Sequence, residues 1–263
     1  MSNDIMNLQL WQIGAAYVFI ALLLVIVRKR GIGREREILM ASVRMTLQLV
    51  LVGYVLVYIF ESTNPLMTIL AVGVMEAFAI DNIFKRTKEK LTGKLKKIIA
   101  FSMVTGTLTS ILYFLFVVIR IYPWFNPQYF IPIAGMIIGN SMTGISLGVK
   151  GIADGMRNKR ALVESSLMLG ATPAKASKEI VNSAFDSAIL PTINSMVGMG
   201  IVSLPGMMTG QILSGTSPLI ATKYQIAIML GIVGSVALSV ILFVILGYRT
   251  FFNHQDQLIQ VED

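Results

Sequence analysis

Residues 8–27 read LQLWQIGAAYVFIALLLVIV, an apolar run without a charged residue. About 20 apolar residues are enough for a helix to cross the hydrocarbon core of a bilayer. No basic segment precedes the run and no small-residue cleavage site ends it, so we expect a retained membrane span and not a signal peptide.

The composition of the whole chain is that of an integral membrane protein. Of its 263 residues, 55% are hydrophobic and 14% are charged, and the mean hydropathy is +0.73. Soluble domains carry roughly 25% charged residues. The chain has no cysteine, and its one histidine, His254, lies in a polar tail. Zinc catalysis and Ser/His hydrolysis are therefore not expected.

The same length criterion predicts an all-α fold with seven membrane spans in a single transmembrane domain. The predicted spans are residues 8–27, 38–60, 65–83, 98–119, 129–149, 188–204 with a broken extension to 215, and 224–248.

The basic residues predict how the chain is oriented. Alternate connections and the C-terminal tail hold 19 of the 22 Lys and Arg residues, the opposite side holds only Arg120 and Lys223, and Arg44 lies inside a span. The positive-inside rule then puts the N-terminus outside and the C-terminus in the cytoplasm of a multi-pass protein of the cell membrane. This segregation favours a role in topology and lipid contact over nucleic-acid binding.

The longest connection, residues 150–187, is too short for an independent domain. Its apolar residues recur at roughly helical spacing on both sides of a break at Gly170 to Pro173. We expect a cytoplasmic helical coupling segment, a helix, a break and a second helix, that could dock on a soluble partner.

Within this segment, Glu164, Ser165, Ser166, Gly170 and Ile180 are similar to the E-A-A-x-x-x-G-x9-I pattern with which permeases of ATP-binding-cassette transporters contact their ATPase. Two serines replace the alanines, and Leu-Pro comes later than the pattern has it, at residues 190–191. Taken alone, an ordinary amphipathic loop explains these residues equally well.

A longer stretch carries a more specific resemblance. The segments LGATP (169–173), LPTINSM (190–196), VSLPGMMTGQILSG (202–215) and YQI (224–226) resemble the FetB-like iron-export permease family, which includes plant aluminium-sensitivity membrane proteins. The resemblance implies a homodimeric permease that exports a metal ion such as iron and works with a separate ATPase. It also implies that Ala171, Thr172 and Pro173 share the ATPase contact, and that ATP binds to the partner while this chain holds no cofactor.

Ionisable side chains inside spans are expensive and predict functional positions. Glu76 and Asp81 lie in the third predicted span, and Arg44 lies in the second at a depth comparable to that of Glu76. An ion pair between Arg44 and Glu76 would be structural. Alternatively, Glu76 or Asp81 supplies oxygen ligands to a transported cation.

Uncharged polar and small residues leave a similar choice open. Asn140 and Asn194 could line the substrate path or join helices by hydrogen bonds. Gly135, Gly139 and Gly144 favour close helix packing. Met196, Met199, Met207 and Met208 are more typical of apolar filling than of a soft-metal path.

Pro205, Gly206 and Gly210 interrupt the sixth predicted span. Such a break is tolerated at membrane depth only where protein or a water-filled cavity satisfies the backbone. It is either a simple kink or the hinge of an outer gate.

No G-x-x-x-x-G-K-[ST] phosphate loop occurs in the chain, so energy for transport would come from a partner. The sequence thus favours a non-enzymatic transporter subunit. The alternatives are a secondary carrier or channel driven by an ion gradient, which lacks a convincing inverted repeat, and a membrane hydrolase, which lacks a catalytic constellation.

Overall fold

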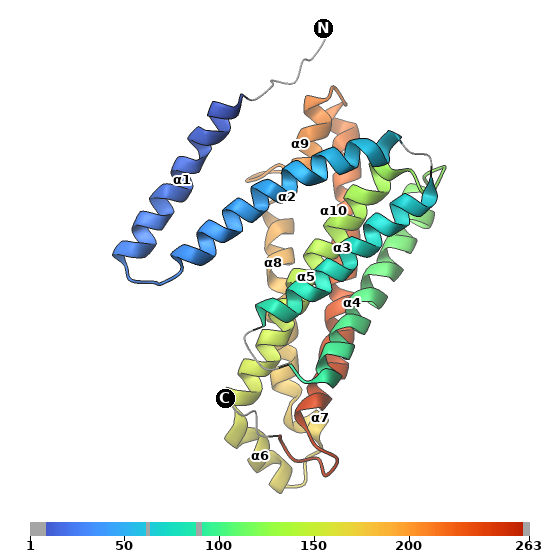
Figure 1. Ribbon diagram of the computed structural model, residues 1–263. Helices are drawn as coiled ribbons and strands as arrows, with labels where there is room; N and C mark the ends of the chain where they lie inside the picture. The colour runs from blue at the N-terminus through green and yellow to red at the C-terminus, as the bar shows by residue number, and fades with distance from the viewer. Residues whose placement is uncertain (1–8, 62–63, 88–90, 260–263) are drawn as a thin grey trace. The chain divides into compact units, whose positions relative to one another are not determined.

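The computed structural model describes residues 9–61, 64–87 and 91–259 (Figure 1), and within these ranges the chain is helical and forms no strand. The expected start of the first span at Leu8 and two of the basic residues, Lys88 and Lys90, lie outside the described residues. The helices are α1 (Leu10–Lys29), α2 (Glu35–Glu61), α3 (Pro65–Arg86), α4 (Gly93–Tyr113) with a π-helical end (Phe114–Ile119), α5 (Pro127–Asn158), α6 (Arg160–Met168), α7 (Pro173–Ala176), α8 (Lys178–Gly198), α9 (Gly206–Leu213) and α10 (Pro218–Gly247), which ends in a 3-10 turn (Tyr248–Phe251).

Six of these helices are long and apolar enough to cross a membrane, so the protein is multi-pass, as predicted. They are α1, α2, α3, α4 with its π-helical end, α5, and α10 with its 3-10 turn. The helix expected at 188–204 instead occupies Lys178–Gly198. Its first half carries Lys178, Glu179 and Asp186, and uncharged polar residues recur along its whole length, so α8 is not in the apolar set.

By their internal packing, the residues form two compact units, Met1–Thr63 with Leu213–Gly215 and the remainder of the chain. In the first unit, α1 and α2 form a helical hairpin. Gly31 and Gly33 in its turn have φ angles of 64° and 71°, which glycine adopts without strain. The hydroxyls of Tyr17 and Thr46 contact each other between the two helices.

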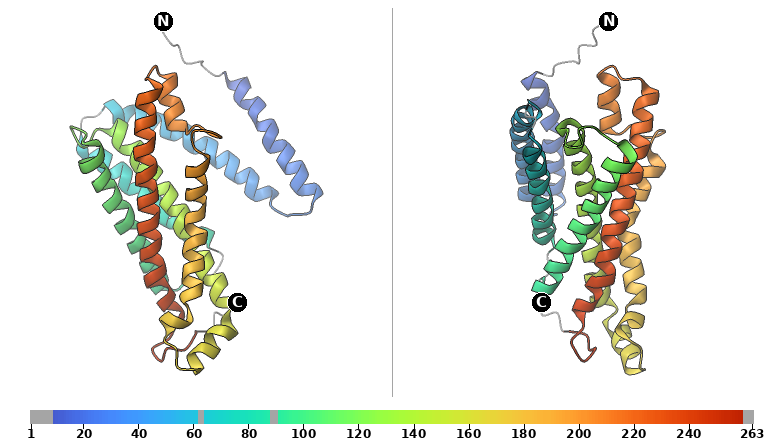
Figure 2. Two further views of the ribbon diagram at one scale, coloured as in Figure 1. Left: turned by 180° about the vertical axis from the view of Figure 1, so that it is seen from behind. Right: turned by 90° about the vertical axis from the view of Figure 1, so that its right-hand side faces the viewer.

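In the second unit, α5 and α10 lie at the centre and α3, α4 and α8 pack around them (Figure 2). Helix α5 contacts α3, α4, α8 and α10, and α10 also contacts α4 and α8. The buried core of the unit runs along these helices and includes Ile99, Met103, Ile145, Val236 and Phe243.

Glycines bring the central helices close together. A β-carbon on Gly106 would lie 2.8 Å from the Cα of Ser239, so α4 and α10 meet backbone to backbone. One on Gly151 would lie 3.0 Å from the Cα of Ala184, so α5 and α8 also meet closely. Small residues at helix interfaces give membrane bundles this kind of contact.

The three glycines expected to promote packing behave differently. A β-carbon on Gly135 would lie 2.8 Å from Met75 Cε, and one on Gly144 would lie 2.9 Å from Val236 Cγ1, so both positions are packed as predicted. The prediction was wrong for Gly139, whose β-carbon would meet no atom of the described chain within 4 Å. Gly139 is on a side of α5 that none of the neighbouring helices covers this closely.

The ends of the second unit differ in chemistry. At one end, α3 and α5 finish, α4 begins and α6 and α7 lie (Figure 1), and this end carries Lys85, Arg86, Lys96 and Arg157. At the other end, the ring of Trp124 packs against three other aromatic rings, with centroids 6.3 Å from Phe116, 5.7 Å from Phe125 and 6.2 Å from Phe130. Basic residues and interfacial aromatics are thus separated along the bundle.

We predict that Gly106→Ala destabilises the protein by about 1–3 kcal/mol, because the new methyl group would collide with the backbone of α10. Gly139→Ala is the matched control. It adds the same methyl group in open space and should be neutral or stabilise by up to about 1 kcal/mol through higher helix propensity. Thermal unfolding of the purified protein in detergent measures both, and equal effects would contradict the packing described here.

Candidate functional site

The segment between α5 and α8 is a helical elbow. Helix α6 is followed by a turn at residues 169–172 and then by α7, so the predicted helix, break and helix are confirmed. Gly170 has a φ of 87°, and its N–H donates to Leu167 O at 2.9 Å, while Ala171 N–H donates to Ser166 O at 3.0 Å. This pair of bonds around a left-handed glycine closes a helix C-terminus. Pro173 then begins α7, in the first-turn position that suits proline.

The elbow is anchored to the bundle by a few buried side chains. Val163 of α6 and Ile180 of α8 are buried, and Ile180 packs against Gly155 near the end of α5. An ion pair of 2.6 Å between Lys159 Nζ and Glu179 joins the end of α5 to the start of α8. The elbow is therefore packed onto the end of α5 and the start of α8.

Most of the predicted coupling residues have partners inside the elbow. Glu164 accepts from Arg160 Nε at 2.8 Å, and Ser166 Oγ donates to Leu162 O at 2.8 Å, whereas Ser165 is exposed. The most exposed apolar side chains of the elbow lie at its tip, where Met168 and Leu169 are 87% and 90% exposed. Sequence reasoning missed these two residues, although their signal is visible as an apolar pair directly before the helix-ending glycine.

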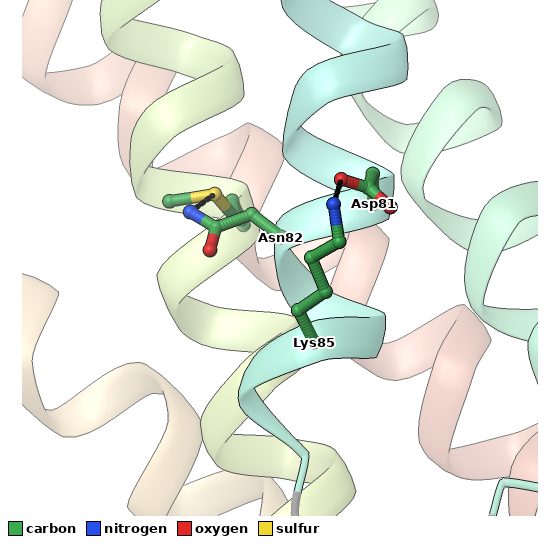
Figure 3. A network of polar contacts seen from close by, with 4 residues as sticks. Asp81, Asn82 and Lys85 are labelled. Carbon is green, nitrogen blue, oxygen red and sulfur yellow. Dashed lines mark hydrogen bonds and ion pairs between the residues drawn. The ribbon is translucent and has the colours of Figure 1, made fainter. Parts of the chain in front are cut away.

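The two intramembrane carboxylates of α3 are separate from each other. Glu76 Oε1 accepts a hydrogen bond of 3.0 Å from Thr107 of α4, and Thr107 is buried. Asp81 pairs with Lys85 one turn later, at 2.6 Å, and both are exposed (Figure 3). The neighbouring Asn82 points to the other side of α3, where its amide approaches Met142 Sδ at 3.5 Å.

The structure thus gives Glu76 a helix-joining contact and Asp81 a local ion pair. In the described ranges, no three residues among His, Cys, Asp and Glu come together as a metal site. The predicted ion pair between Arg44 and Glu76 joins α2 in the first unit to α3 in the second, and it stays a prediction.

The uncharged polar residues of α5 and α8 divide into two groups. Ser141 of α5 and Ser235 of α10 are buried and share a hydrogen bond of 2.9 Å, which joins the two helices. Asn140 and Asn194 are exposed. Asn140 Nδ2 donates to Met136 O at 2.8 Å, and Asn194 has no side-chain hydrogen bond within the described chain. Within the described chain, Asn140 and Asn194 are therefore not covered by the neighbouring helices.

The interruption after α8 begins earlier than predicted. The helix ends at Gly198, a short bridge pairs Met199 with Ser203, and Gly200 N–H donates to Ser203 O at 2.9 Å with φ of 88°. Pro205 directly precedes α9, and Thr209 N–H donates to its carbonyl at 2.9 Å. The expected continuous helix to residue 204 is therefore replaced by a link at 199–205.

The predicted hinge glycines, Gly206 and Gly210, do not have the left-handed backbone conformation found at the turns on either side of α9. Gly206 and Gly210 belong to α9, and a β-carbon on either would meet no described atom within 4 Å. The left-handed positions are Gly200 and Gly215, on either side of α9, with φ of 88° and 94°. The turns that need glycine therefore lie before and after α9, whereas the prediction placed the hinge at Pro205, Gly206 and Gly210.

One residue near the link escaped the sequence analysis. Gln225 of α10 is only 6% exposed, and its Nε2 lies 3.6 Å from Met199 Sδ at the end of α8. In the sequence, Gln225 could have been found as the single amide side chain in the apolar span predicted at 224–248.

Comparisons with known proteins identify the family of the chain. Residues 10–252 match the profile of UPF0014, described as an uncharacterised protein family. The chain is 36% identical over 252 residues to a UPF0014 membrane protein of Synechocystis, covering 95% of this chain and 94% of the relative.

Two further relatives have more specific names. Protein ALUMINUM SENSITIVE 3 of Arabidopsis thaliana is 36% identical over 244 residues, which are 93% of this chain and 88% of the relative. The probable iron export permease protein FetB of Escherichia coli is 33% identical over 244 residues, which are 93% of this chain and 92% of the relative. No solved structure is significantly similar. With a family match that spans nearly its whole length, the chain belongs to the UPF0014 family of membrane proteins.

Proposed function

We propose that this protein is the permease subunit of an ATP-binding-cassette transporter that exports a metal ion, with iron as the cargo suggested by the name of the FetB relative. The observation that carries the proposal is the elbow of α6 and α7. It presents Met168 and Leu169 to solvent at the basic end of the bundle, where a soluble partner would bind.

The energy comes from ATP bound and hydrolysed on a separate ATPase chain, and this chain needs no cofactor of its own. In our proposal, Glu164, Ser165, Ser166 and the turn from Gly170 to Pro173 shape the elbow, and the two apolar side chains at its tip enter the partner. Movement of the elbow is passed to α5 and α8 through the buried contacts of Val163 and Ile180. ATP drives transport only if it binds more tightly to one state of the assembly than to the other.

The proposed membrane arrangement has seven crossings, with α8 and α9 together as the interrupted sixth. The N-terminus is outside and the basic end is cytoplasmic, as the distribution of Lys and Arg indicates. Two permease copies share one path, which Asn140 and Asn194 line. Exposed amides at membrane depth are costly against lipid, and a second copy or a hydrated path would satisfy them.

We predict that the double variant Met168→Ser, Leu169→Ser loses the complex with the ATPase and loses ATP-dependent transport. Removing two exposed apolar side chains from the tip takes away buried area in the complex but nothing from the bundle. Co-purification of the two subunits and transport into inverted vesicles are the measurements. Leu219→Ser, at a 77% exposed position at the start of α10, is the control and should retain the complex. A double variant that still co-purifies would overturn the docking surface.

We predict that Glu76→Gln lowers transport per folded molecule little, because the amide oxygen of Gln can still accept the hydrogen bond from Thr107. Thr107→Val should lower the free energy of unfolding by about 1 kcal/mol, because it removes that hydrogen bond. Thr109→Val, at an exposed position of α4, is its control. Quantified membrane expression beside transport separates the two roles. A Glu76→Gln variant that is fully expressed and inactive would make Glu76 part of the path.

We predict that Pro205→Ala leaves the ATPase complex intact and changes the transport rate. The proline ends the link at 199–205 and fixes where α9 begins, so its loss lets the backbone of the link extend α9. Co-purification and transport are measured on the same preparation. A wild-type transport rate would remove residues 205, 206 and 210 from any gate.

A further inference from the structure

The interruption between α8 and α9 faces an amide that has no adequate partner. Gln225 is 6% exposed and lies within a span of α10. Its Oε1 is buried and accepts no hydrogen bond within the described chain. A buried amide without partners costs a few kcal/mol, and such a cost is usually offset by function or by a bound group.

The contact with Met199 does not satisfy this amide. The Nε2 atom lies 3.6 Å from Met199 Sδ, and a thioether is a weak acceptor. A half-turn of the amide would place Oε1 against the sulfur instead, where it would have no donor at all. In either orientation, a thioether sulfur and an amide oxygen lie within reach of one small group between α8 and α10.

The end of α8 also brings backbone carbonyl oxygens close to Met199. Met199 directly follows the last residue of α8, and its N–H donates to Met196 O at 3.3 Å, while the N–H groups of Val202 and Ser203 donate to Gly198 O at 3.0 and 3.2 Å. The last carbonyls of a helix lack intrahelical donors and carry the negative end of the helix dipole. Ends of interrupted helices bind cations in other membrane transporters for this reason.

We propose that Met199 Sδ and Gln225 Oε1, beside the end of α8, form a binding site for a soft or borderline transition-metal cation. This inference rests on the proposed function as a metal exporter and gives the cargo a position in the chain. The thioether selects against hard ions such as Mg²⁺, which prefer carboxylates and water. The site has no carboxylate, so it holds the ion without a countercharge, and weak binding of this kind allows release.

The side chains of Met199 and Gln225 face the interior of the protein, as a binding site requires. Met199 packs against the buried core, and so does Met207 on the other side of the link. By contrast, Met196, less than one turn before Met199, is exposed. Met196 therefore offers a matched control, because it has the same chemistry and lies beside the site, but it is more exposed and the hydrogen bond of Gln225 goes to Met199.

The experiment measures Fe²⁺ binding to the full-length permease in lipid nanodiscs, without the ATPase and without oxygen, by equilibrium dialysis and metal analysis. Gln225→Leu and Met199→Leu should each weaken Fe²⁺ binding about tenfold or more, the order of loss that follows removal of a group supporting a metal site. Met196→Leu should bind as the wild type does. Gln225→Glu should bind Fe²⁺ more tightly, because it brings a negative charge to the same position. A large excess of Mg²⁺ should displace little Fe²⁺.

The inference is overturned if Gln225→Leu and Met199→Leu bind Fe²⁺ as the wild type does, or if Gln225→Glu binds no more tightly while remaining monodisperse. The glutamate variant keeps the size of the side chain, so it decides the matter even if the leucine variants do not fold. Failure of the proposed function looks different. In that case the wild type binds Fe²⁺ at this site but forms no complex with the ATPase, whereas failure of the inference leaves the complex and transport intact.

Discussion

The close approach of α5 to α8 and of α4 to α10 is the contact on which the rest of the second unit depends. Gly106 and Gly151 leave room for the backbones of the facing helices, and any side chain there would separate them. Lipid tails are as apolar as leucine, so helices in a bilayer gain little by burying apolar surface against each other and rely on packing and polar contacts. The hydrogen bond between Ser141 and Ser235 adds such a contact in the centre.

This packing also explains why the intramembrane polar residues differ so much in their surroundings. Thr107 and Ser141 lie where helices meet, and each finds a partner on the neighbouring helix. Asn140 and Asn194 lie on surfaces that no helix of the second unit covers. Gln225 is buried, yet its neighbour is a thioether. Polar side chains of similar chemistry therefore join helices, are candidates to line a substrate path, or are candidates to bind a metal ion, according to what packs against them.

Much of the fold could be predicted from the sequence. Long apolar runs give the helices α1 to α5 and α10 because the bilayer requires their length, and the break at Gly170 was visible because glycine and proline end helices by known backbone rules. Helix α8 was harder, since Lys178, Glu179 and Asp186 hid its first half from an apolar criterion. The end of α8 at Gly198 was also missed. The conspicuous Pro205 drew attention to the start of α9, while the chain had already left the helix at Met199.

The site was less predictable than the fold because its residues depend on contacts between distant parts of the chain. From the sequence, Asp81 is a candidate cation ligand, but in the structure it forms an ion pair with Lys85. The spacing of the two residues allows this pair but does not decide which rotamers they adopt. The pairing of Gln225 with Met199 joins positions in two different helices, and the hydrophobic pattern of either helix alone does not reveal it.

The length of α5 has a mechanical consequence. Its 32 residues rise about 48 Å, whereas the hydrocarbon core of a bilayer is about 30 Å thick. In the proposed arrangement, the surplus of about three turns places the α6–α7 elbow outside the hydrocarbon core. A soluble protein that bound the elbow would then act on the end of a single helix, and that helix runs without a break to the middle of the bilayer.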